Sequence, residues 1–250
     1  MYQQVRQDAI MDILRKEGYV TVAYLTRQLH YSTATINRDL NALSRQGLVR
    51  RSYGGAELAD PHSVKLPFRY HKMKTEKRLI GQAAAALIQP GDTVFIDGTT
   101  TTQSMAPHLT DIEGLTVITN NLALVEFLSG EGVDVLCLGG RIAEPPSMVC
   151  DAETVRQASG YRADKLFFST GGFTADGVIG CGIRSPYRLL HKAMAAGATQ
   201  RFFLADHDKL DAATEVRLFD FGQVEGIISD YRFPEETVAR FPQTQFICVK

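Results

Sequence analysis

Apolar side chains near the start of the chain recur at the spacing of amphipathic helices. The first such segment is 5–16, with apolar positions at Val5, Ala9, Ile10, Ile13 and Leu14. Gly18 is a suitable end for it, and Thr21 is placed to cap a second short helix that continues through Leu25 and Leu29. This stretch therefore predicts two short helices in close succession.

A third helix and a hairpin are predicted next. Residues 33–46 keep the helical spacing, and Gly47 is a suitable end for that helix. Short β-prone runs then flank the pair Gly54-Gly55, which predicts a β-hairpin with a tight turn. Three short helices and a hairpin make the pattern of a winged helix-turn-helix, which we assign to residues 1–56.

The rest of the chain alternates between short apolar runs and helical patterns. Residues 57–74 carry two prolines and mixed charge and are interpreted as a linker to an α/β domain at 75–250. Helices are predicted over 74–88 and 122–128. Strands are predicted over 93–97, 115–119, 133–138, 165–169, 201–205 and 226–229, with a last edge strand over 245–249. Such alternation predicts a largely parallel, Rossmann-like sheet covered by helices on both faces.

Charge is distributed unevenly between the two predicted domains. Residues 1–56 hold eight Lys/Arg and four Asp/Glu, a net charge of +4, so the remainder carries −5 to give the whole-chain value of −1. A basic head on an acidic body is typical of a protein that holds nucleic acid at one end.

The four cysteines are widely spaced and form no C-x-x-C pair. This pattern argues against a zinc finger and predicts free thiols in a reducing cytoplasm. No run approaches the roughly 18 apolar residues of a membrane span, and the N-terminus lacks the apolar run of a signal peptide. We therefore expect a cytoplasmic protein without membrane contact, metal or cofactor.

The third helix has two distinct sides on a helical wheel. Ile36, Leu40 and Leu43 fall together and face the small core. The opposite side is formed by small, amide and guanidinium side chains: Ala34, Arg38, Asn41 and Arg45. Arginine can bind guanine with two hydrogen bonds and asparagine can bind adenine, so this side is suited to the major groove. The alternative is an ordinary solvated face, with the arginines paired to neighbouring acids.

Flanking residues extend the predicted DNA surface. Thr35 and Asn37 lie beside the reading side, and Ser32 and Thr33 lie at the helix N-terminus, where phosphate is held well. Arg50 and Arg51 on the hairpin would add phosphate contacts that do not depend on sequence. Asp39 lies nearer the core side and is expected to pair within the domain.

These motifs resemble the DeoR family of bacterial sugar-operon regulators. The resemblance is carried by 20–25 (VTVAYL), 32–43 (STATINRDLNAL), Gly47-Leu48 and 51–56 (RSYGGA). It extends into the body through 67–69 (PFR), Glu76-Lys77, Ile80-Gly81, 96–102 (IDGTTTT), 119–121 (TNN), Gly139-Gly140, 204–206 (LAD) and Lys209. The resemblance implies a body similar to sugar-phosphate isomerases that binds a phosphosugar and changes DNA affinity.

This chain departs from the family pattern at three places. The family usually has two arginines where this chain has Asn37-Arg38. It often has an acidic residue where this chain has Arg188, and Gly-x-Asp-Gly in place of the segment 169–172 (STGG).

The residues also indicate an effector site independently of the resemblance. A loop at 97–102 follows an apolar strand and opens a helix, so its N–H groups and threonine hydroxyls suit a phosphate. Ligands of parallel sheets bind beyond the carboxyl ends of the strands. The candidates are Asp97, Gly98, Thr99, Thr100, Thr101, Thr119, Asn120, Gly139, Gly140, Gly171, Lys192 and Lys209. Each glycine or asparagine loop alone could be an ordinary turn, and Lys209 could simply pair with Asp208.

Two other functions stay open at this point. A sugar-phosphate isomerase would need a general base, for which Asp97 or His207 with Asp206 or Asp208 are the candidates. An architectural DNA binder would need no ligand. For a regulator we expect paired heads on a double-stranded operator, and therefore a homo-oligomer, because one small head buries too little surface to select a site.

Overall fold

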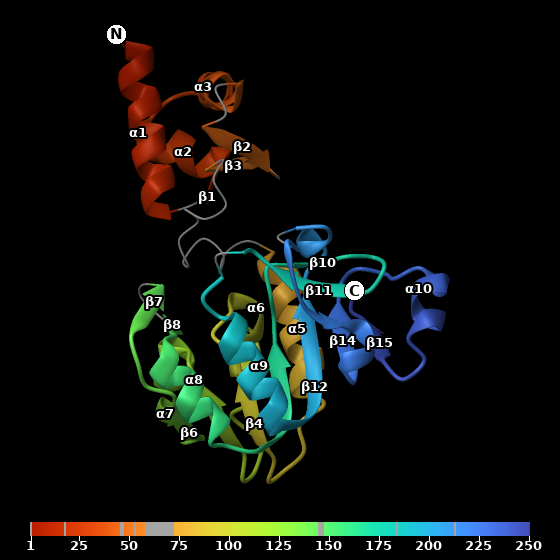
Figure 1. Cartoon of the computed structure of the whole chain (residues 1–250). Helices are drawn as coiled ribbons and strands as arrows, with labels where there is room; N and C mark the ends of the chain where they lie inside the picture. Colours follow the sequence, from red (N-terminus) through yellow and green to blue (C-terminus); the bar gives the residue numbers. More distant parts are fainter. Residues whose placement is uncertain are drawn as a thin grey trace. The chain divides into compact units, whose positions relative to one another are not determined.

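The computed structural model describes residues 2–17, 19–45, 48–52, 54–58, 73–144, 148–183, 185–212 and 214–250. The chain divides into two compact units, Met1–Lys72 and Met73–Lys250 (Figure 1). Of the predicted linker, Glu57 and Leu58 belong to a strand, and Lys74 begins the helix that was predicted from this residue. The predicted linker residues 59–72, the predicted helix ends Gly18 and Gly47, and Gln46 and Tyr53 lie outside the described residues.

The first unit has the predicted three helices and hairpin. Its elements are α1 (Tyr2–Glu17), β1 (Tyr19–Thr21), α2 (Val22–Leu29), α3 (Thr33–Arg45), β2 (Val49–Ser52) and β3 (Gly55–Leu58). The Thr21 hydroxyl accepts the Tyr24 N–H at 3.1 Å, which confirms the predicted cap of α2.

The hairpin carries an additional strand. β1 pairs with β3 to give the antiparallel order β1-β3-β2, and this three-residue strand was too short to predict from a period of two. Gly54 turns the chain with a φ of +69°, and a Cβ at Gly55 would lie 2.2 Å from the Val20 carbonyl oxygen. The Gly-Gly pair is therefore required by both the turn and the close approach of β1.

The second unit contains the predicted parallel sheet. Its seven strands follow the order β15-β14-β12-β9-β4-β5-β6. They are β4 (Thr93–Ile96), β5 (Thr116–Thr119), β6 (Asp134–Cys137), β9 (Ala163–Phe168), β12 (Ala198–Ala205), β14 (Gly226–Ser229) and β15 (Gln245–Cys248). Chain order increases from β4 through β5 to β6 on one side and from β9 through β12 and β14 to β15 on the other. The topological switch point therefore lies between β4 and β9, and open α/β sheets bind ligands at this point.

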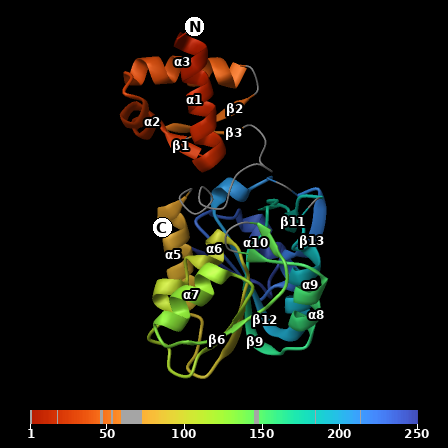
Figure 2. The ribbon, with the colours of Figure 1, turned by 90° about the vertical axis from the view of Figure 1, so that its left-hand side faces the viewer.

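Helices cover both faces of this sheet (Figure 2). α5 (Lys74–Ala85) and α7 (Leu122–Gly130) lie on one face, and α8 (Ala152–Ser159) and α9 (Arg188–Gly197) lie on the other. α5 ends three residues before the predicted 88, because Leu87 N–H bonds to Ala84 O at 3.1 Å in a tighter turn. The shorter helices α6 (Thr100–Gln103) and α10 (Glu235–Arg240) complete the described helices of this unit, apart from three single 3₁₀ turns.

Two small sheets were not predicted. One is a hairpin of β7 (Ile142–Glu144) and β8 (Met148–Val149), and the other joins β10 (Gly172–Phe173), β11 (Val178–Cys181) and β13 (Val216–Asp220). These strands are two to five residues long, so they leave no readable periodicity in the sequence.

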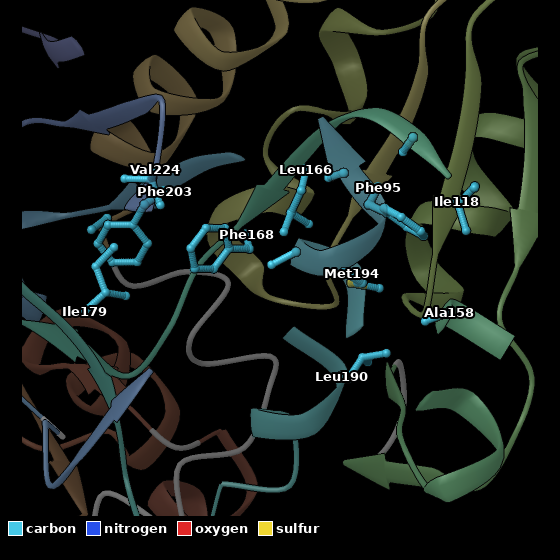
Figure 3. Packing of buried hydrophobic residues seen from close by; sticks show 14 of the residues in the cluster. Phe95, Ile118, Ala158, Leu166, Phe168, Ile179, Leu190, Met194, Phe203 and Val224 are labelled. Atoms are coloured by element: carbon cyan, nitrogen blue, oxygen red, sulfur yellow. The ribbon is translucent and has the colours of Figure 1, made fainter. Parts of the chain in front are cut away.

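The core has one cluster on each face of the sheet. The side chains of β4 alternate between the two clusters. Phe95 lies in the cluster under α8 and α9, whereas Val94 and Ile96 lie in the cluster under α5 and α7. Figure 3 shows the first cluster, where Phe168 packs against Phe203 with ring centroids 5.4 Å apart. Each fully buried side chain of this size contributes about 1.5–3 kcal/mol. These clusters fix the strand ends where the polar loops begin.

Candidate DNA-reading surface and effector site

The two sides of α3 lie as the helical wheel predicts. Ile36, Leu40 and Leu43 are buried in the core of the first unit. The side chains predicted to face DNA are exposed: Ala34, Arg38, Asn41 and Arg45. Arg45 Nε donates to the carbonyl oxygen of Asn41 at 3.3 Å, so the end of this row is held against its own helix.

Ser32 is the cap of α3. Its hydroxyl accepts the N–H of Thr35 at 3.2 Å and lies 2.9 Å from the Thr35 hydroxyl. Ser32 and Thr33 are exposed and Thr35 is half-buried. The hydroxyls at this helix start thus close the first turn, and the exposed positions beside them remain candidates for phosphate contact.

The two hairpin arginines have different surroundings. Arg50 is exposed, with its side chain 62% accessible and its Nε 4.0 Å from a Glu57 carboxylate oxygen. Arg51 is half-buried and donates from Nη2 to the Asn37 Oδ1 atom at 2.6 Å. The expectation of a free phosphate contact therefore fits Arg50, whereas Arg51 is engaged with α3.

A buried ion pair holds α3 to α1. Asp39 is fully buried and accepts two hydrogen bonds from Arg6, one of them at 3.2 Å. The Arg6 guanidinium also lies over the Tyr31 ring, 4.7 Å from its centroid. The pKa of Arg6 is raised, mainly by its hydrogen bond to Asp39. The predicted intradomain pairing of Asp39 is confirmed, and it fixes the orientation of the reading helix.

In the second unit, Asp97 is the centre of the loop that follows β4. Its Oδ1 accepts the N–H and hydroxyl of Thr99 at 3.1 and 2.8 Å and the hydroxyl of Thr102 at 2.6 Å. Its Oδ2 accepts the N–H of Ser169 at 3.0 Å and lies 2.8 Å from His191 Nε2. The carboxylate therefore joins β4, β9 and α9 at the switch point of the sheet.

The electrostatics of Asp97 favour the ionised form. Only 1% of the residue is exposed, and this burial by itself raises the pKa of the carboxyl. The hydrogen bond and charge of His191 and the bonds from Thr102 and Ser169 outweigh burial and hold the pKa below its ordinary value. With both oxygens bonded inside the protein, Asp97 shapes the loop, which gives it a scaffolding role. Its role as an effector contact stays a prediction.

Two lysines bind the threonines of this loop. Lys209 Nζ donates to the Thr101 hydroxyl at 3.0 Å and to the Ser169 hydroxyl at 2.5 Å. Lys77, on the buried side of α5, places its Nζ 3.3 Å from the Thr100 hydroxyl. Thr100 and Thr101 thus each bind an ammonium group, which is the chemistry an anionic ligand requires. A pairing of Lys209 with Asp208 alone, the alternative raised by the sequence, would not account for the bonds of Lys209 to Thr101 and Ser169.

The helix that the loop opens is short. α6 spans four residues, with Thr99 as its cap. Its peptide dipoles add up over a single turn, so the expected contribution of a helix N-terminus to phosphate binding is small here. The lysines and hydroxyls have to supply the attraction.

On α9, the residue beside the predicted Lys192 is the one that faces the loop. Lys192 is exposed, whereas His191 is buried and reaches Asp97. Lys192 as an effector contact stays a prediction, and His191 is the residue of this pair that the structure brings to the loop, as a positioning residue. The His191 Nδ1 atom is buried without a hydrogen-bond partner in the described structure.

The hairpin β7–β8 covers Gly98 and Asn120. A Cβ at Gly98 would lie 2.6 Å from the sulfur of Met148, so this side chain rests directly on the loop. Asn120 Nδ2 donates to Val149 O at 2.8 Å, and Val149 N–H donates back to Asn120 O at 2.9 Å. Thr119 is fully buried and accepts the N–H of Asn121 at 3.1 Å. These residues are brought to the loop, where hairpin and turn contacts engage Thr119 and the Asn120 Nδ2 atom, while Asn120 Oδ1 is buried without a partner among the described residues.

The remaining predicted glycines have other surroundings. Gly139 N–H donates to Gln157 Oε1 at 2.9 Å on α8. Gly140, at a φ of +136°, packs so closely on the cap of α8 that a Cβ would lie 2.3 Å from the Thr154 hydroxyl. Both glycines make the turn that seats α8, and Gly171 is exposed. Gly139 and Gly140 are thus packing positions, and their part in an effector site stays a prediction.

The candidate bases for an isomerase are engaged elsewhere. His207 Nδ1 is paired with Asp230, and the His207 N–H donates to the same carboxylate at 2.8 Å. The hydrogen bond to Asp230 raises the pKa of His207. Asp206 is buried and Asp208 lies beside the His207 ring at 3.9 Å. His207 is thus an anchor between the ends of β12 and β14.

Lys77, His191 and Met148 were missed in the sequence, although two of them carry a signal. Lys77 and His191 interrupt the buried stripes of their helices, where apolar residues are expected. A charged or polar residue on such a stripe indicates a buried partner. Met148 has no such signal, because only the hairpin places it over Gly98.

All four cysteines are free. Across the ranges given above, no helix is long and apolar enough to cross a membrane. In the same ranges no three His, Cys, Asp or Glu side chains gather in a way that could hold a metal ion.

Comparison with known proteins gives two family matches and several relatives. Residues 6–62 match the DeoR-like helix-turn-helix domain and residues 72–231 match the DeoR C terminal sensor domain. The HTH-type transcriptional repressor GlcR of Bacillus subtilis is 32% identical over 240 residues, covering 94% of this chain and 91% of the relative. The glycerol-3-phosphate regulon repressor of Escherichia coli is 28% identical over 235 residues, covering 92% of each.

Comparison with solved structures gives partial matches. Ribose 5-phosphate isomerase A from Neisseria gonorrhoeae matches 54% of this chain and 52% of its own, with a TM-score of 0.40 and 12% identity. The reading helix, the hairpin and the parallel sensor sheet agree with the two family matches, and the chain belongs to the DeoR family of transcriptional regulators.

Proposed function

We propose that the protein represses a carbohydrate operon and that a small phosphorylated sugar changes its affinity for DNA. The relatives support the first half, since several are named repressors, among them a glycerol-3-phosphate regulon repressor and the lactose phosphotransferase system repressor of Lactococcus lactis. The second half rests on the loop after β4.

One observation carries the DNA-binding part. The exposed row Arg38, Asn41 and Arg45 lies opposite a buried aliphatic stripe on α3, with the exposed Arg50 on the adjoining hairpin. Guanidinium and amide groups on an exposed helix supply both base and phosphate contacts.

The effector is proposed to bind at the switch point of the sheet. Lys209 and Lys77 hold the hydroxyls of Thr101 and Thr100, and the Ser169 hydroxyl lies between β9 and Lys209. A phosphate that replaces these internal contacts would keep both ammonium groups satisfied, and the sugar hydroxyls would meet the polar ends of β5 and β12. Because one head cannot select a site in a genome, the working form is proposed to be a homo-oligomer on repeated half-sites.

The test is a binding titration of the full chain by fluorescence anisotropy. Duplex fragments from upstream of its own gene are titrated between about 50 and 200 mM salt, where counterion release makes phosphate-dominated binding fall steeply. Sugar phosphates and their unphosphorylated counterparts are then added separately. We expect one phosphorylated compound to change DNA affinity by about 5–150-fold, the usual range of coupling. Salt-dependent DNA binding without any response to a phosphosugar would leave an architectural binder, and turnover of aldose or ketose phosphates would indicate the isomerase.

A further inference from the structure

We infer that Arg51 positions the base-reading amide of Asn37 and is not a phosphate contact. In this arrangement Asn37 presents its NH₂ group, and only that group, to the major groove. The inference rests on the proposed DNA-binding function and adds to it the chemical group that is read.

The contact fixes the orientation of the Asn37 side chain. Arg51 Nη2 lies 2.6 Å from Asn37 Oδ1 and joins β2 to α3. A guanidinium group has only donors, so the amide oxygen must face Arg51 and the NH₂ group must point away from it. Arg51 Nη1 is buried and has no hydrogen-bond partner in the described part of the chain, so this guanidinium is directed into the unit and not toward solvent.

The position of Asn37 puts the NH₂ group beside the reading row. Thr33, Asn37 and Asn41 are separated by four residues each, which makes them neighbours along one side of α3. Thr33 and Asn41 are exposed and Asn37 is half-buried under the hairpin. Asn37 therefore lies at the border between the helix face that enters the groove and the hairpin that supports it.

The adjacent arginine provides the contrast. Side chains alternate across a strand, so Arg50 and Arg51 on β2 point to opposite faces. Arg50 has 62% of its side chain accessible, and its nearest described carboxylate, on Glu57, is 4.0 Å away. One hairpin arginine is thus available for phosphate, and the other is used to hold α3.

The fixed amide restricts what Asn37 can read. Adenine is normally recognised by asparagine through its oxygen and its NH₂ group together. Here the Arg51 guanidinium binds one of the two lone pairs of that oxygen and holds the oxygen toward β2. The NH₂ group alone can donate to guanine O6 or N7, adenine N7 or thymine O4. We therefore expect Asn37 to select a base pair that presents a hydrogen-bond acceptor in the major groove. The exposed Asn41 can use both its amide oxygen and its NH₂ group to bind adenine.

The experiment compares two hairpin arginines on the same DNA. The wild-type chain first selects a duplex from a random pool, and Kd is then measured for that duplex and for calf-thymus DNA across a salt series. The variants are R51M, which keeps the aliphatic stem, together with N37A, the R51M/N37A double variant, and R50M as the matched control. Thermal unfolding of each variant shows whether the head is folded.

The inference predicts different losses at the two positions. R50M should weaken both duplexes alike and reduce the slope of log K against log salt by about 1. R51M should weaken the selected duplex by about tenfold, leave calf-thymus binding and the salt slope unchanged, and add nothing to N37A. A base-substitution scan should show R51M and N37A losing discrimination at the same base pair.

Two outcomes overturn the inference. If R51M weakens both duplexes and lowers the salt slope as R50M does, Arg51 is a phosphate contact. If the effects of R51M and N37A add independently, Arg51 does not act through Asn37. Failure of the wild-type chain to select any duplex would instead overturn the proposed function, and this inference with it.

Discussion

His191 Nε2 lies 2.8 Å from Asp97 Oδ2, and this contact joins α9 to the end of β4 beneath the threonine loop. An ionised carboxylate can only accept, so the His191 ring must carry a proton on Nε2. The pair sits in the interior beside Phe168, whose ring centroid is 5.8 Å from that of His191. The loop that is proposed to hold the effector is therefore supported by a buried polar pair and not by its own short helix.

Replacing Asp97 by Asn should destabilise the sensor unit strongly. Each of its two oxygens accepts hydrogen bonds from inside the protein, so an NH₂ group in either place would meet donors. Breaking a buried pair of this kind costs about 3–5 kcal/mol. Urea unfolding of the full chain measures it, with the exposed Asp111→Asn as the matched control, for which a change within about 0.5 kcal/mol is expected. A loss below about 1 kcal/mol for Asp97→Asn would contradict the scaffolding role.

The same pair sets a pH dependence. Because the pKa of Asp97 is lowered in the folded state, its stabilisation is present above the unfolded value near ~3.9 and is lost as the pH falls through the folded value. The difference in unfolding free energy between wild type and Asp97→Asn should stay constant at neutral pH and shrink as the pH falls below about 4. A difference that grows on acidification would have the wrong sign for this account.

His207 should titrate above an ordinary histidine. Its hydrogen bond to Asp230 raises its pKa, so the stabilisation from this pair is present below the unfolded value near ~6.5 and is lost as the pH rises through the raised value. An NMR titration of the imidazole should show the raised pKa in wild type and a return toward the ordinary value in Asp230→Asn. The side chain is 45% accessible, so the effect on stability is expected to be small. An unchanged imidazole pKa in the variant would exclude Asp230 as its cause.

Gly98 and Met148 should be energetically coupled. A methyl group at Gly98 would lie 2.6 Å from the Met148 sulfur and 3.0 Å from Asn120 Nδ2, so Gly98→Ala must displace the hairpin side chain. Overpacking of this kind costs about 1–3 kcal/mol. In a double-mutant cycle, Met148→Ala should relieve part of the Gly98→Ala cost, giving a total below the sum of the single changes. Strict additivity would show that Met148 does not rest on the loop.

Effector response should depend on Lys209 and not on Lys192. Lys209 holds Thr101 and Ser169, whereas Lys192 is exposed on α9. Lys209→Met should abolish or strongly weaken the change in DNA affinity caused by the active phosphosugar, with DNA binding itself retained. Lys192→Met is the control and should respond as wild type in the same anisotropy assay. The reverse result would move the effector site away from the switch point.

Sequence patterns predicted the main sheet because buried parallel strands appear as short apolar runs between helices. They also located the loop at 97–102, since a polar loop at a strand end stands out. The sides of α3 were predicted from its helical wheel, but those of α9 were not. Because α9 itself was not predicted, no wheel could show which of His191 and Lys192 would face inward. Contacts between distant segments, such as Met148 over Gly98 and Arg51 on Asn37, depend on the packing of hairpins whose register no local pattern shows.

The most direct test of the whole account is the salt dependence of operator binding by Arg38→Ala. Arg38 is exposed at the centre of the reading row on α3. Loss of a guanine contact should cost about 1–3 kcal/mol on the selected duplex, and loss of a phosphate contact should lower the salt slope by about 1. The account predicts one or both of these losses in a variant that melts at the wild-type temperature. Unchanged affinity and unchanged slope would show that α3 does not hold DNA.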